Sequence, residues 1–413
     1  MNLFTHLELR GWRQFREVRI DFHPRLTVLT GANGAGKTTL LSLVSRHFGW
    51  QAQYVSTPRI ATDEALLKYV ADLWAKYFDD QRRTAQVSIG SITYGSGARA
   101  DLQIPREVGS TYEVSLMNQE HVEGLHIPSH RPLYAYQAVA SIPTSVSGAH
   151  SLWQQYSSIV QQKYRNEWAQ RSPNSFLKET LIALATFGFG NAAVTPNTEY
   201  RRLFEEFQEI LRKVLPPKIG FQTLSIRIPE VVLETRSGHF SLDAVSGGIA
   251  SIIDIAWQIF MFSSGKSSFA ITIDEPENHL HPELQRTLLG SLLAAFPRAQ
   301  FVVATHNPFI VGSVPDSSVY VLDFGKDNKV STAFLDATNR AGSANDILRE
   351  VLGLASTTAP WVEQRLADIV ARYSEKDIDE ATLAEMRREL GSMGMDQFIP
   401  QSIASVVKRA PSR

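Results

Sequence analysis

The stretch that decides the fold is Gly-Ala-Asn-Gly-Ala-Gly-Lys-Thr at residues 31–38, which fits the pattern Gly-x-x-x-x-Gly-Lys-Thr without a mismatch. An apolar run at residues 26–29 comes before it and predicts a buried strand, and residues 38–44 continue as a helix. Glycines let backbone N–H groups approach phosphate oxygens, and the helix start adds its positive dipole end. The sequence therefore predicts a phosphate-binding loop between a strand and a helix.

Each position of this loop has an expected role in binding ATP and Mg²⁺. Lys37 reaches the β- and γ-phosphates as a point charge and counts as a catalytic residue. The Thr38 hydroxyl is a hard oxygen ligand for Mg²⁺. The other residues expected to contact the nucleotide are Asn33, Gly34, Ala35, Gly36 and Thr39.

A pair of acidic residues follows a second apolar run at residues 269–273. The carboxyl ends of strands in open α/β sheets are where ligands bind, so Asp274 and Glu275 are expected beside the phosphate-binding loop. We expect Asp274 to hold Mg²⁺ and Glu275 to orient the attacking water, whereas Glu277 is expected to be structural.

Histidines supply two further candidates. His306 follows the next apolar run, residues 301–304, and is expected to contact the γ-phosphate and the water. His279 and His281 lie two residues apart near Glu283, which allows either a metal site or an ordinary pair of loop histidines. We favour the loop pair.

The turn Ser246-Gly247-Gly248 opens a helix ahead of Asp274. Alone it is a weak signal, because many helix N-termini look like this. The order of loop, Ser-Gly-Gly turn, Asp-Glu pair and histidine resembles ATP-binding-cassette ATPases. This resemblance implies that Ser246, Gly247 and Gly248 complete the ATP site of an opposite subunit, and that two heads sandwich two ATPs.

Residues 26–40, 273–282 and 304–310 are similar to the RecF/SMC/OLD branch of that family. Arg13, in an early Arg/aromatic stretch at residues 10–15, would lie near the adenine; a strand-edge role is the alternative. The tail from residue 345 to about residue 395 resembles standalone ATPases of anti-phage defence, of the Septu or retron-associated kind, which implies a nuclease partner.

Other features are less clear. Ile249 stands where the family usually has a polar residue after the second glycine. The family implies a glutamine that bridges Mg²⁺; Gln137 is the first candidate and Gln53 the second, and either is as easily an exposed loop residue. The neighbouring run at residues 129–132, Ser-His-Arg-Pro, is either a sensor loop or a polar turn. No Asp-x-Asp follows a strand after residue 314, so we expect no nuclease domain of the OLD kind.

The expected fold class is α/β: an ABC-type head with a mixed, largely parallel core sheet, an antiparallel β subdomain, an inserted helical subdomain and a helical tail. The expected divisions are residues 1–140 (N-terminal lobe), 141–220 (helical insertion), 221–343 (C-terminal lobe) and 344–413 (tail). Apolar spacing predicts a helix over 62–78. Period-two runs between 85 and 128 predict an antiparallel meander.

Composition excludes several classes of protein. The 413 residues carry 41 basic and 42 acidic side chains, so no global positive field attracts nucleic acid. No cysteine is present, which excludes a disulfide scaffold, a Cys zinc site and a thiol nucleophile. The N-terminus has no signal-peptide core and no apolar run is long enough to span a membrane. We expect a cytoplasmic protein.

Three functions remain to be compared. The first is an ATPase switch that forms a homodimer or higher homo-oligomer and controls a nuclease or other DNA-related effector. The second is a DNA-repair or chromosome-maintenance ATPase that binds DNA itself. The third, a transporter subunit, is disfavoured because Lys37 and Ser246 lie too far apart in the sequence.

Overall fold

The computed structural model describes residues 2–60, 67–71, 73, 85–131, 136–144, 148–165, 167–168, 171–336, 342–354, 356–376 and 379–409. The chain divides into two compact units, Met1–Gly353 and Leu354–Arg413. Each unit has its own hydrophobic core. The helical tail expected from residue 344 therefore contributes its first ten residues to the larger unit, where Ile347 is buried in the main core.

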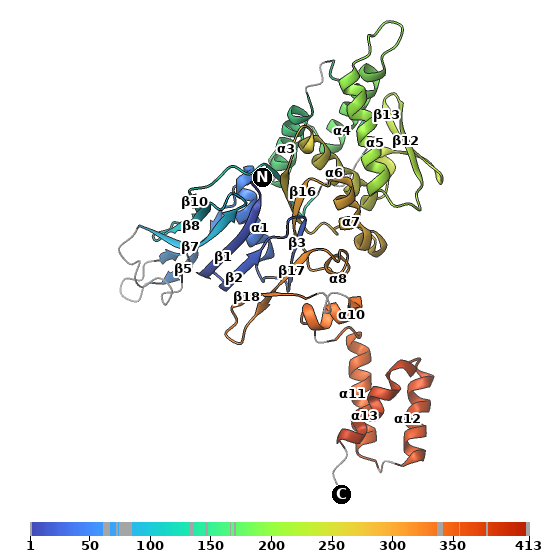
Figure 1. Ribbon diagram of the computed structural model, residues 1–413. Coiled ribbons are helices and arrows are strands. Elements are labelled where there is room, and N and C mark those ends of the chain that lie inside the picture. The colour runs from blue at the N-terminus through green and yellow to red at the C-terminus, as the bar shows by residue number, and fades with distance from the viewer. Residues whose placement is uncertain are drawn as a thin grey trace. The chain divides into compact units, whose positions relative to one another are not determined.

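A large mixed sheet organises the first unit (Figure 1). In spatial order, the 11-stranded sheet of the described residues contains β10 (Ser115–Met117), β8 (Arg99–Pro105), β7 (Gln86–Tyr94), β1 (Phe4–Trp12), β2 (Phe15–Asp21), β18 (Val330–Phe334), β17 (Ser318–Phe324), β3 (Leu26–Gly31), β16 (Ala299–Ala304), β15 (Phe269–Asp274) and β11 (Gly124–Ile127). The strands from β17 to β11 run parallel to one another, and those from β10 to β2 are antiparallel. The mixed α/β fold expected from the sequence is confirmed.

The central strands are buried on both faces, which explains why their sequences are continuous apolar runs. On β16, Phe301 and Val303 face one hydrophobic core, and Val302 and Ala304 face the other. The first core lies under helices and the second lies between the sheet and α1 (Lys37–Ser45). The strand ends that carry the candidate site are thus fixed by packing from both sides.

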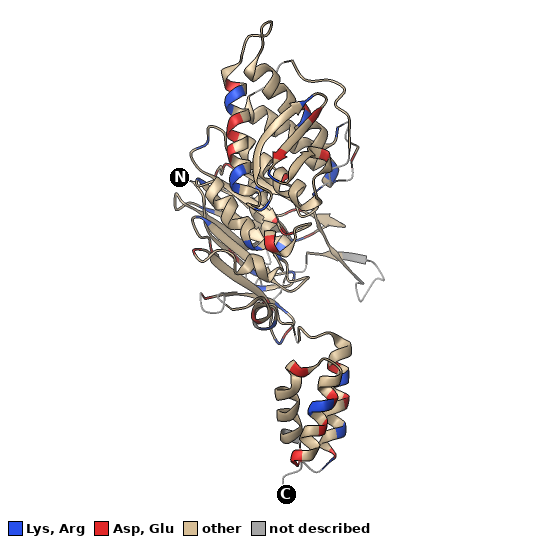
Figure 2. Cartoon of the chain, turned by 90° about the vertical axis from the view of Figure 1, so that its right-hand side faces the viewer, with Lys and Arg blue, Asp and Glu red and all other residues tan. Residues whose placement is uncertain are grey.

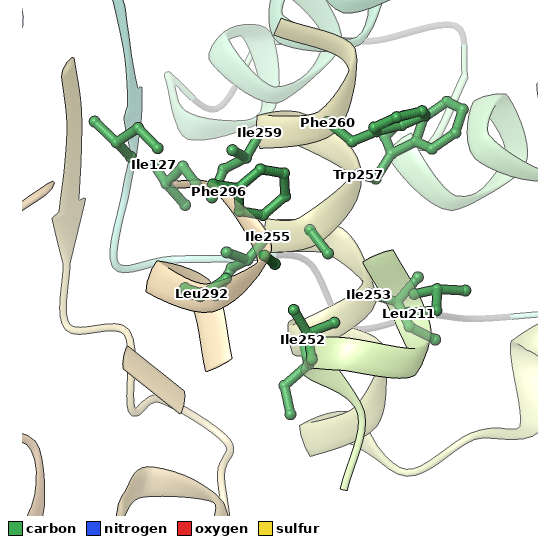
Figure 3. Packing of buried hydrophobic residues seen from close by; sticks show 14 of the residues in the cluster. Ile127, Leu211, Ile252, Ile253, Ile255, Trp257, Ile259, Phe260, Leu292 and Phe296 are labelled. Carbon is green, nitrogen blue, oxygen red and sulfur yellow. The ribbon is translucent and has the colours of Figure 1, made fainter. Parts of the chain in front are cut away.

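Helices cover the first of these faces (Figure 1). They are α3 (Ala149–Tyr164), α4 (Pro173–Phe189), α5 (Thr198–Val214), α6 (Gly247–Ser263) and α7 (Pro282–Ala295). α6 is mostly apolar and is buried from Gly248 to Ser263, as expected of a central core helix, with one buried polar stripe of Ser251, Asp254 and Gln258. Figure 3 shows Ile252, Ile255 and Trp257 of this helix among side chains from its neighbours.

Smaller elements complete the two units. The first unit also contains a three-stranded sheet of β12 (Phe221–Arg227), β13 (Glu230–Thr235) and β14 (Gly238–Ser241). Two short strand pairs are β4 (Tyr54–Val55) with β9 (Thr111–Tyr112) and β5 (Thr57–Ile60) with β6 (Leu67–Val70). Its short helices include α8 (Pro308–Val311) and α10 (Ala344–Asp346). The second unit contains α11 (Pro360–Ser374), α12 (Glu380–Ser392) and α13 (Ile399–Arg409), packed around Ile369, Met386 and Leu390.

Two local predictions were wrong. The helix expected over 62–78 is replaced by β6 at Leu67–Val70, Ala71 is buried in the core, and Leu73 bridges Trp12; the other positions lie outside the described residues. The helical spacing of apolar residues was overridden by pairing with β5, a near neighbour in the chain, and by the contact with β1. The antiparallel meander holds for β7, β8 and β10, but β11 leaves it and pairs parallel with β15. Alternating apolar residues do not specify the direction of the partner strand.

Candidate functional site

The phosphate-binding loop leaves β3 at Gly31 and enters α1 at Lys37. Glycine is required at both ends of the turn. A Cβ at Gly31, where φ is +140°, would lie 2.3 Å from the Leu322 carbonyl oxygen. One at Gly36, where φ is +98°, would lie 2.4 Å from the Phe15 ring. These contacts fix the path of a backbone that carries Asn33, Gly34 and Ala35 between them.

Lys37 is 7% exposed, an unusually deep position for a lysine. Its Nζ donates to the carbonyl oxygens of Gly31 at 2.8 Å and Ala32 at 3.0 Å. Burial lowers the pKa of Lys37, and the nearby carboxylates of Glu275, Asp274 and Glu277 oppose that shift. The ammonium group therefore lies inside the loop and close to the acidic pair, as the motif predicts.

Thr38 and Asp274 meet at the start of α1. The Thr38 hydroxyl donates to Asp274 Oδ2 at 3.0 Å, and Asp274 is 5% exposed at the end of β15. Burial raises the pKa of Asp274, which the Thr38 hydrogen bond opposes. A hydroxyl and a buried carboxylate this close form a set of hard oxygen donors, so these residues fit Mg²⁺.

Glu275, the next residue, has a left-handed backbone with φ of +45°. Its N–H donates to the Ala304 carbonyl oxygen at 2.8 Å, which continues the strand pairing by one residue. Its carboxylate lies 3.2 Å from His306 Nδ1 and accepts from Asn278 Nδ2 at 3.1 Å. The structure thus brings together Glu275 and His306, two residues that the sequence placed on neighbouring strands.

Glu277 differs from Glu275 because it is nearly enclosed, with 5% exposure. The Thr305 hydroxyl donates to its Oε1, and its Oε2 is buried without a hydrogen-bond partner. Burial raises the pKa of Glu277, and the Thr305 hydrogen bond opposes this. These contacts join the loop after β15 to the loop after β16, which agrees with the structural role expected for Glu277.

Ser246 caps α6, and its hydroxyl accepts from the Ile249 N–H at 3.5 Å. A Cβ at Gly248 would lie 3.0 Å from the His279 carbonyl oxygen, so glycine permits a close approach between this turn and the loop after Asp274. Among the described residues, none of the hydrogen bonds joins Ser246, Gly247 or Gly248 to Lys37.

Arg13 occupies the tight turn between β1 and β2, with φ of +52°. Its guanidinium lies 5.6 Å from the Tyr54 ring centroid and 6.0 Å from that of Trp12. The following residues, Gln14 and Phe15, line the space next to Gly36. The turn that carries Arg13 therefore borders the phosphate-binding loop through Gln14 and Phe15, and the Arg13 side chain faces the Tyr54 and Trp12 rings.

The two candidate glutamines lie in different places. Gln53 is exposed just before Tyr54, whose hydroxyl is 2.7 Å from that of Ser42 on α1. The Gln137 side chain accepts from the Ser172 hydroxyl at 2.7 Å, and its carbonyl oxygen accepts from Lys178 at 2.9 Å. The structure thus places Gln53 near the nucleotide-binding helix and Gln137 against α4, and a magnesium-bridging glutamine remains a prediction.

The histidine pair after Asp274 does not form a metal site. His281 caps α7, where its Nδ1 accepts from the Glu283 N–H at 3.3 Å, and Glu283 pairs with Lys218 at 2.5 Å. Within the part of the chain that the structure describes, no group of three or more His, Asp or Glu residues could hold a metal ion.

Arg131 is the functional candidate that the sequence left undecided. It is 6% exposed, and its guanidinium donates to four carbonyl oxygens and one hydroxyl around the Asp-Glu loop. The sequence feature that could have identified Arg131 is its position in the Ser-His-Arg-Pro run shortly after β11. That run could be recognised as important only once β11 was known to lie beside β15.

The fold and these motifs define the class of protein. A P-loop, a buried strand that ends in Asp-Glu, a histidine just after the intervening strand β16 and a Ser-Gly-Gly helix start are the motifs of an α/β P-loop ATPase. The chain resembles the ATPases of bacterial defence systems. No helix among the described residues combines the length and apolar character needed to cross a membrane.

Comparisons with known proteins support this class. The family model described as "AAA domain, putative AbiEii toxin, Type IV TA system" matches residues 191–312, and one described as "AAA domain" matches residues 6–88. The Septu protein PtuA of Bacillus thuringiensis is 23% identical over 239 residues, which are 51% of this chain and 58% of that protein. The "Retron Ec83 probable ATPase" of Escherichia coli is 23% identical over 192 residues, 44% of this chain and 34% of that protein. The matched stretches thus span less than two thirds of both relatives.

Solved structures with a similar fold include the Smc head domain of Pyrococcus furiosus bound to the C-terminal domain of ScpA. It has a TM-score of 0.45 and 14% identity, and the match covers 85% of this chain and all of that one. The SMC head domain of Thermotoga maritima has a TM-score of 0.42 and 14% identity, and the match covers 81% of this chain and 99% of that one.

Proposed function

We propose that this chain binds and hydrolyses ATP in a head-to-tail dimer and acts as a nucleotide-driven switch for a DNA-related effector. The observation that carries the proposal is the meeting of Lys37, Thr38, Asp274, Glu275 and His306 at one edge of the sheet. These groups come from the ends of three strands, and phosphoryl transfer depends on such positioning and charge.

Each residue has a defined part in the proposed reaction. Lys37 and the loop amides bind the phosphates, and Glu275 orients the attacking water, with His306 holding the Glu275 carboxylate in place. Thr38 and Asp274 would hold Mg²⁺, which supplies neutralisation of phosphate charge when bound. Asn33, Gly34, Ala35, Gly36 and Thr39 complete the loop around the triphosphate, and Arg13 borders the base.

The dimer is proposed because the Ser-Gly-Gly turn begins a separate helix, and none of the hydrogen bonds of the described residues joins it to Lys37. In ABC-type heads such a turn serves the ATP of the opposite subunit. Ser246, at the exposed start of an otherwise buried helix, is the group that a second copy would use. ATP-driven closure of the two subunits is then the conformational change that the effector detects.

The effector is proposed from the relatives, since a Septu protein and a retron ATPase match this chain. A nuclease is the partner we expect in an anti-phage system, and a cytoplasmic location follows from that setting. A chain that instead acted on DNA directly would need a basic surface. The exposed face of α5 interleaves both signs, with Arg202 pairing to Glu199 at 2.6 Å and to Glu206 at 2.8 Å (Figure 2).

The Glu275→Gln variant tests the proposal. The amide keeps the size of the side chain but removes the charge that orients water, so hydrolysis falls by about 100-fold or more while ATP binding remains. ATP and Mg²⁺ then convert this variant into a stable dimer, which light scattering after size-exclusion chromatography detects. The matched control is Glu283→Gln, an exposed carboxylate on α7. Full turnover by Glu275→Gln would refute the assigned role.

Direct DNA binding is tested separately. Titration of labelled duplex DNA at low salt, with and without ATP, distinguishes the switch from a repair or chromosome-maintenance ATPase. Binding that weakens steeply with salt would favour the second function.

A further inference from the structure

Arg131 is a buried residue next to the strand ends that carry the proposed catalytic groups. It follows β11, which pairs with β15 through Ile127 opposite Ile273, so it emerges beside Asp274 and Glu275. Its Nη2 donates to the carbonyl oxygens of Glu275 at 3.1 Å, Pro276 at 3.2 Å and Asn278 at 3.3 Å. One guanidinium therefore contacts three carbonyls of the same short loop.

This loop needs support because its backbone is strained. Glu275 and His279 have φ of +45° and +71°, in the left-handed region that costs a residue other than glycine about 1–2 kcal/mol. The carbonyl that Arg131 holds and the carboxylate that faces His306 belong to the same residue, Glu275. Fixing the carbonyl restricts rotation of the peptide and so fixes the direction in which the Glu275 side chain leaves the backbone.

The other end of the guanidinium contacts the helix that begins at Ser246. Arg131 Nε donates to the Ser251 hydroxyl at 3.0 Å, and Ser251 is 5% exposed in the first turns of α6. Gly248 of the same helix closely approaches the His279 carbonyl. A single buried side chain thus joins the loop that carries Glu275 to the helix that carries the Ser-Gly-Gly turn.

We propose that Arg131 is a positioning residue that holds the Glu275 loop in its strained conformation and links it to the Ser246 helix. The inference rests on the proposed function. In a head-to-tail dimer, the Glu275 loop acts on one ATP and Ser246 contacts the other. Arg131 therefore connects the two ATP sites within each subunit.

Arginine is suited to this position and lysine is not. A planar guanidinium presents five N–H donors in a fixed fork, whereas an ammonium group is a point charge with three donors. Arg131→Lys keeps the buried positive charge near Asp254 of α6 and near the carboxylates of residues 274, 275 and 277, and leaves several of the carbonyls without a donor. It is therefore a milder change than Arg131→Met, which removes the charge as well.

The first test measures ATP turnover and ATP binding by Arg131→Lys. We expect kcat to fall by about 100-fold, because a small misplacement of Glu275 is enough to cause such a loss. The dissociation constant of a non-hydrolysable ATP analogue, measured by calorimetry, should stay within about twofold because the phosphate-binding loop is untouched. Unchanged kcat would overturn the inference.

A double-mutant comparison separates positioning from general stability. If Arg131 acts through Glu275, Arg131→Lys lowers the residual rate of the Glu275→Gln protein by no more than about twofold. A role in the stability of the whole unit would instead reduce both rates by the same factor, and that result would contradict the proposal. The melting temperature of each variant shows whether it is folded.

The link to α6 is tested with Ser251→Ala, which leaves the carbonyl contacts of Arg131 in place. In the Glu275→Gln background, we expect this change to weaken ATP-driven dimerisation by about fivefold or more, a typical size for coupling between sites. The matched control is Ser263→Ala, a buried serine at the other end of α6 whose hydroxyl donates to the Phe260 carbonyl of its own helix at 3.0 Å. Equal dimerisation of the two double variants would overturn the coupling.

These outcomes keep the two proposals distinct. Absence of ATP hydrolysis by the unmodified protein would refute the proposed function and the inference with it. Hydrolysis by the unmodified protein together with full activity of Arg131→Lys would refute the inference alone.

Discussion

The Thr38 hydroxyl lies 3.0 Å from the Asp274 carboxylate, although 236 positions separate the two residues in the chain. The contact joins the first turn of α1 to the end of β15 and places the two proposed Mg²⁺ ligands side by side. It exists because β16 holds β3 and β15 in parallel register, with Val303 opposite both Val28 and Ile273.

Binding of magnesium nucleotide should weaken as the pH falls from neutral into the acidic range. Burial raises the pKa of Asp274, and only its ionised form binds a cation, so protonation begins at a higher pH than for an exposed aspartate. Calorimetry with a non-hydrolysable ATP analogue and Mg²⁺ across this range measures the effect. Asp274→Asn should bind weakly at every pH. A dissociation constant of the unmodified protein that did not change with pH would contradict the expectation.

Gly36→Ala should abolish nucleotide binding and destabilise the protein. The new Cβ would meet the Phe15 ring at 2.4 Å in addition to the strain of a left-handed alanine. Gly49→Ala is the matched control, because Gly49 has φ of +81° but a Cβ added there would have no atom within 4 Å. We expect Gly49→Ala to cost about 1 kcal/mol and to bind nucleotide normally. Equal losses in the two variants would show that strain alone decides the outcome.

Phe207→Ala should lower the free energy of unfolding by about 3–5 kcal/mol. Phe207 is fully buried, with its ring centroid 4.9 Å from that of Trp257 and 5.6 Å from that of Phe260, so its loss leaves a cavity between α5 and α6. Denaturant unfolding followed by circular dichroism measures the change. Phe240→Ala, at a position 39% exposed, is the control and should cost far less.

Lys178→Met should destabilise the first unit by about 3–5 kcal/mol, because it leaves the buried Asp243 side chain and the partly buried Glu230 side chain without a cation. Lys178 is fully buried in α4, where its Nζ lies 2.9 Å from Glu230 and also pairs with Asp243, just before the Ser-Gly-Gly turn. The melting temperature reports the loss. Lys213→Met, at an exposed position on α5, should leave it almost unchanged.

Short motifs made much of the site predictable. Gly31 to Thr38, Asp274, Glu275 and His306 each follow an apolar strand, and parallel strands end at a common edge of the sheet. The sequence could therefore predict that these residues meet. The prediction needed only the order of the motifs and the parallel direction of the strands, and no knowledge of other long-range contacts.

Contacts between distant segments were not predictable in this way. Arg131 is bound mainly by backbone carbonyls, which leave no mark in a sequence, and its importance depends on β11 pairing with β15. The strand β6 was missed for a different reason: it pairs with β5, its near neighbour in the chain, and this pairing decided its conformation against the helical spacing of its apolar residues. The ion pairs of Lys178 with Asp243 and Glu230 likewise join segments far apart in the chain, so the local sequence around Lys178 does not predict them.

The left-handed backbone at Glu275 sets the stability of its loop against the proposed catalytic role of this residue. Glycine would adopt this conformation with less strain, and asparagine or aspartate would tolerate it better than glutamate does. Each of these replacements removes the glutamate carboxylate that lies 3.2 Å from His306 Nδ1 or shortens the side chain that carries it. Selection for stability alone would therefore favour residues that disrupt the proposed site.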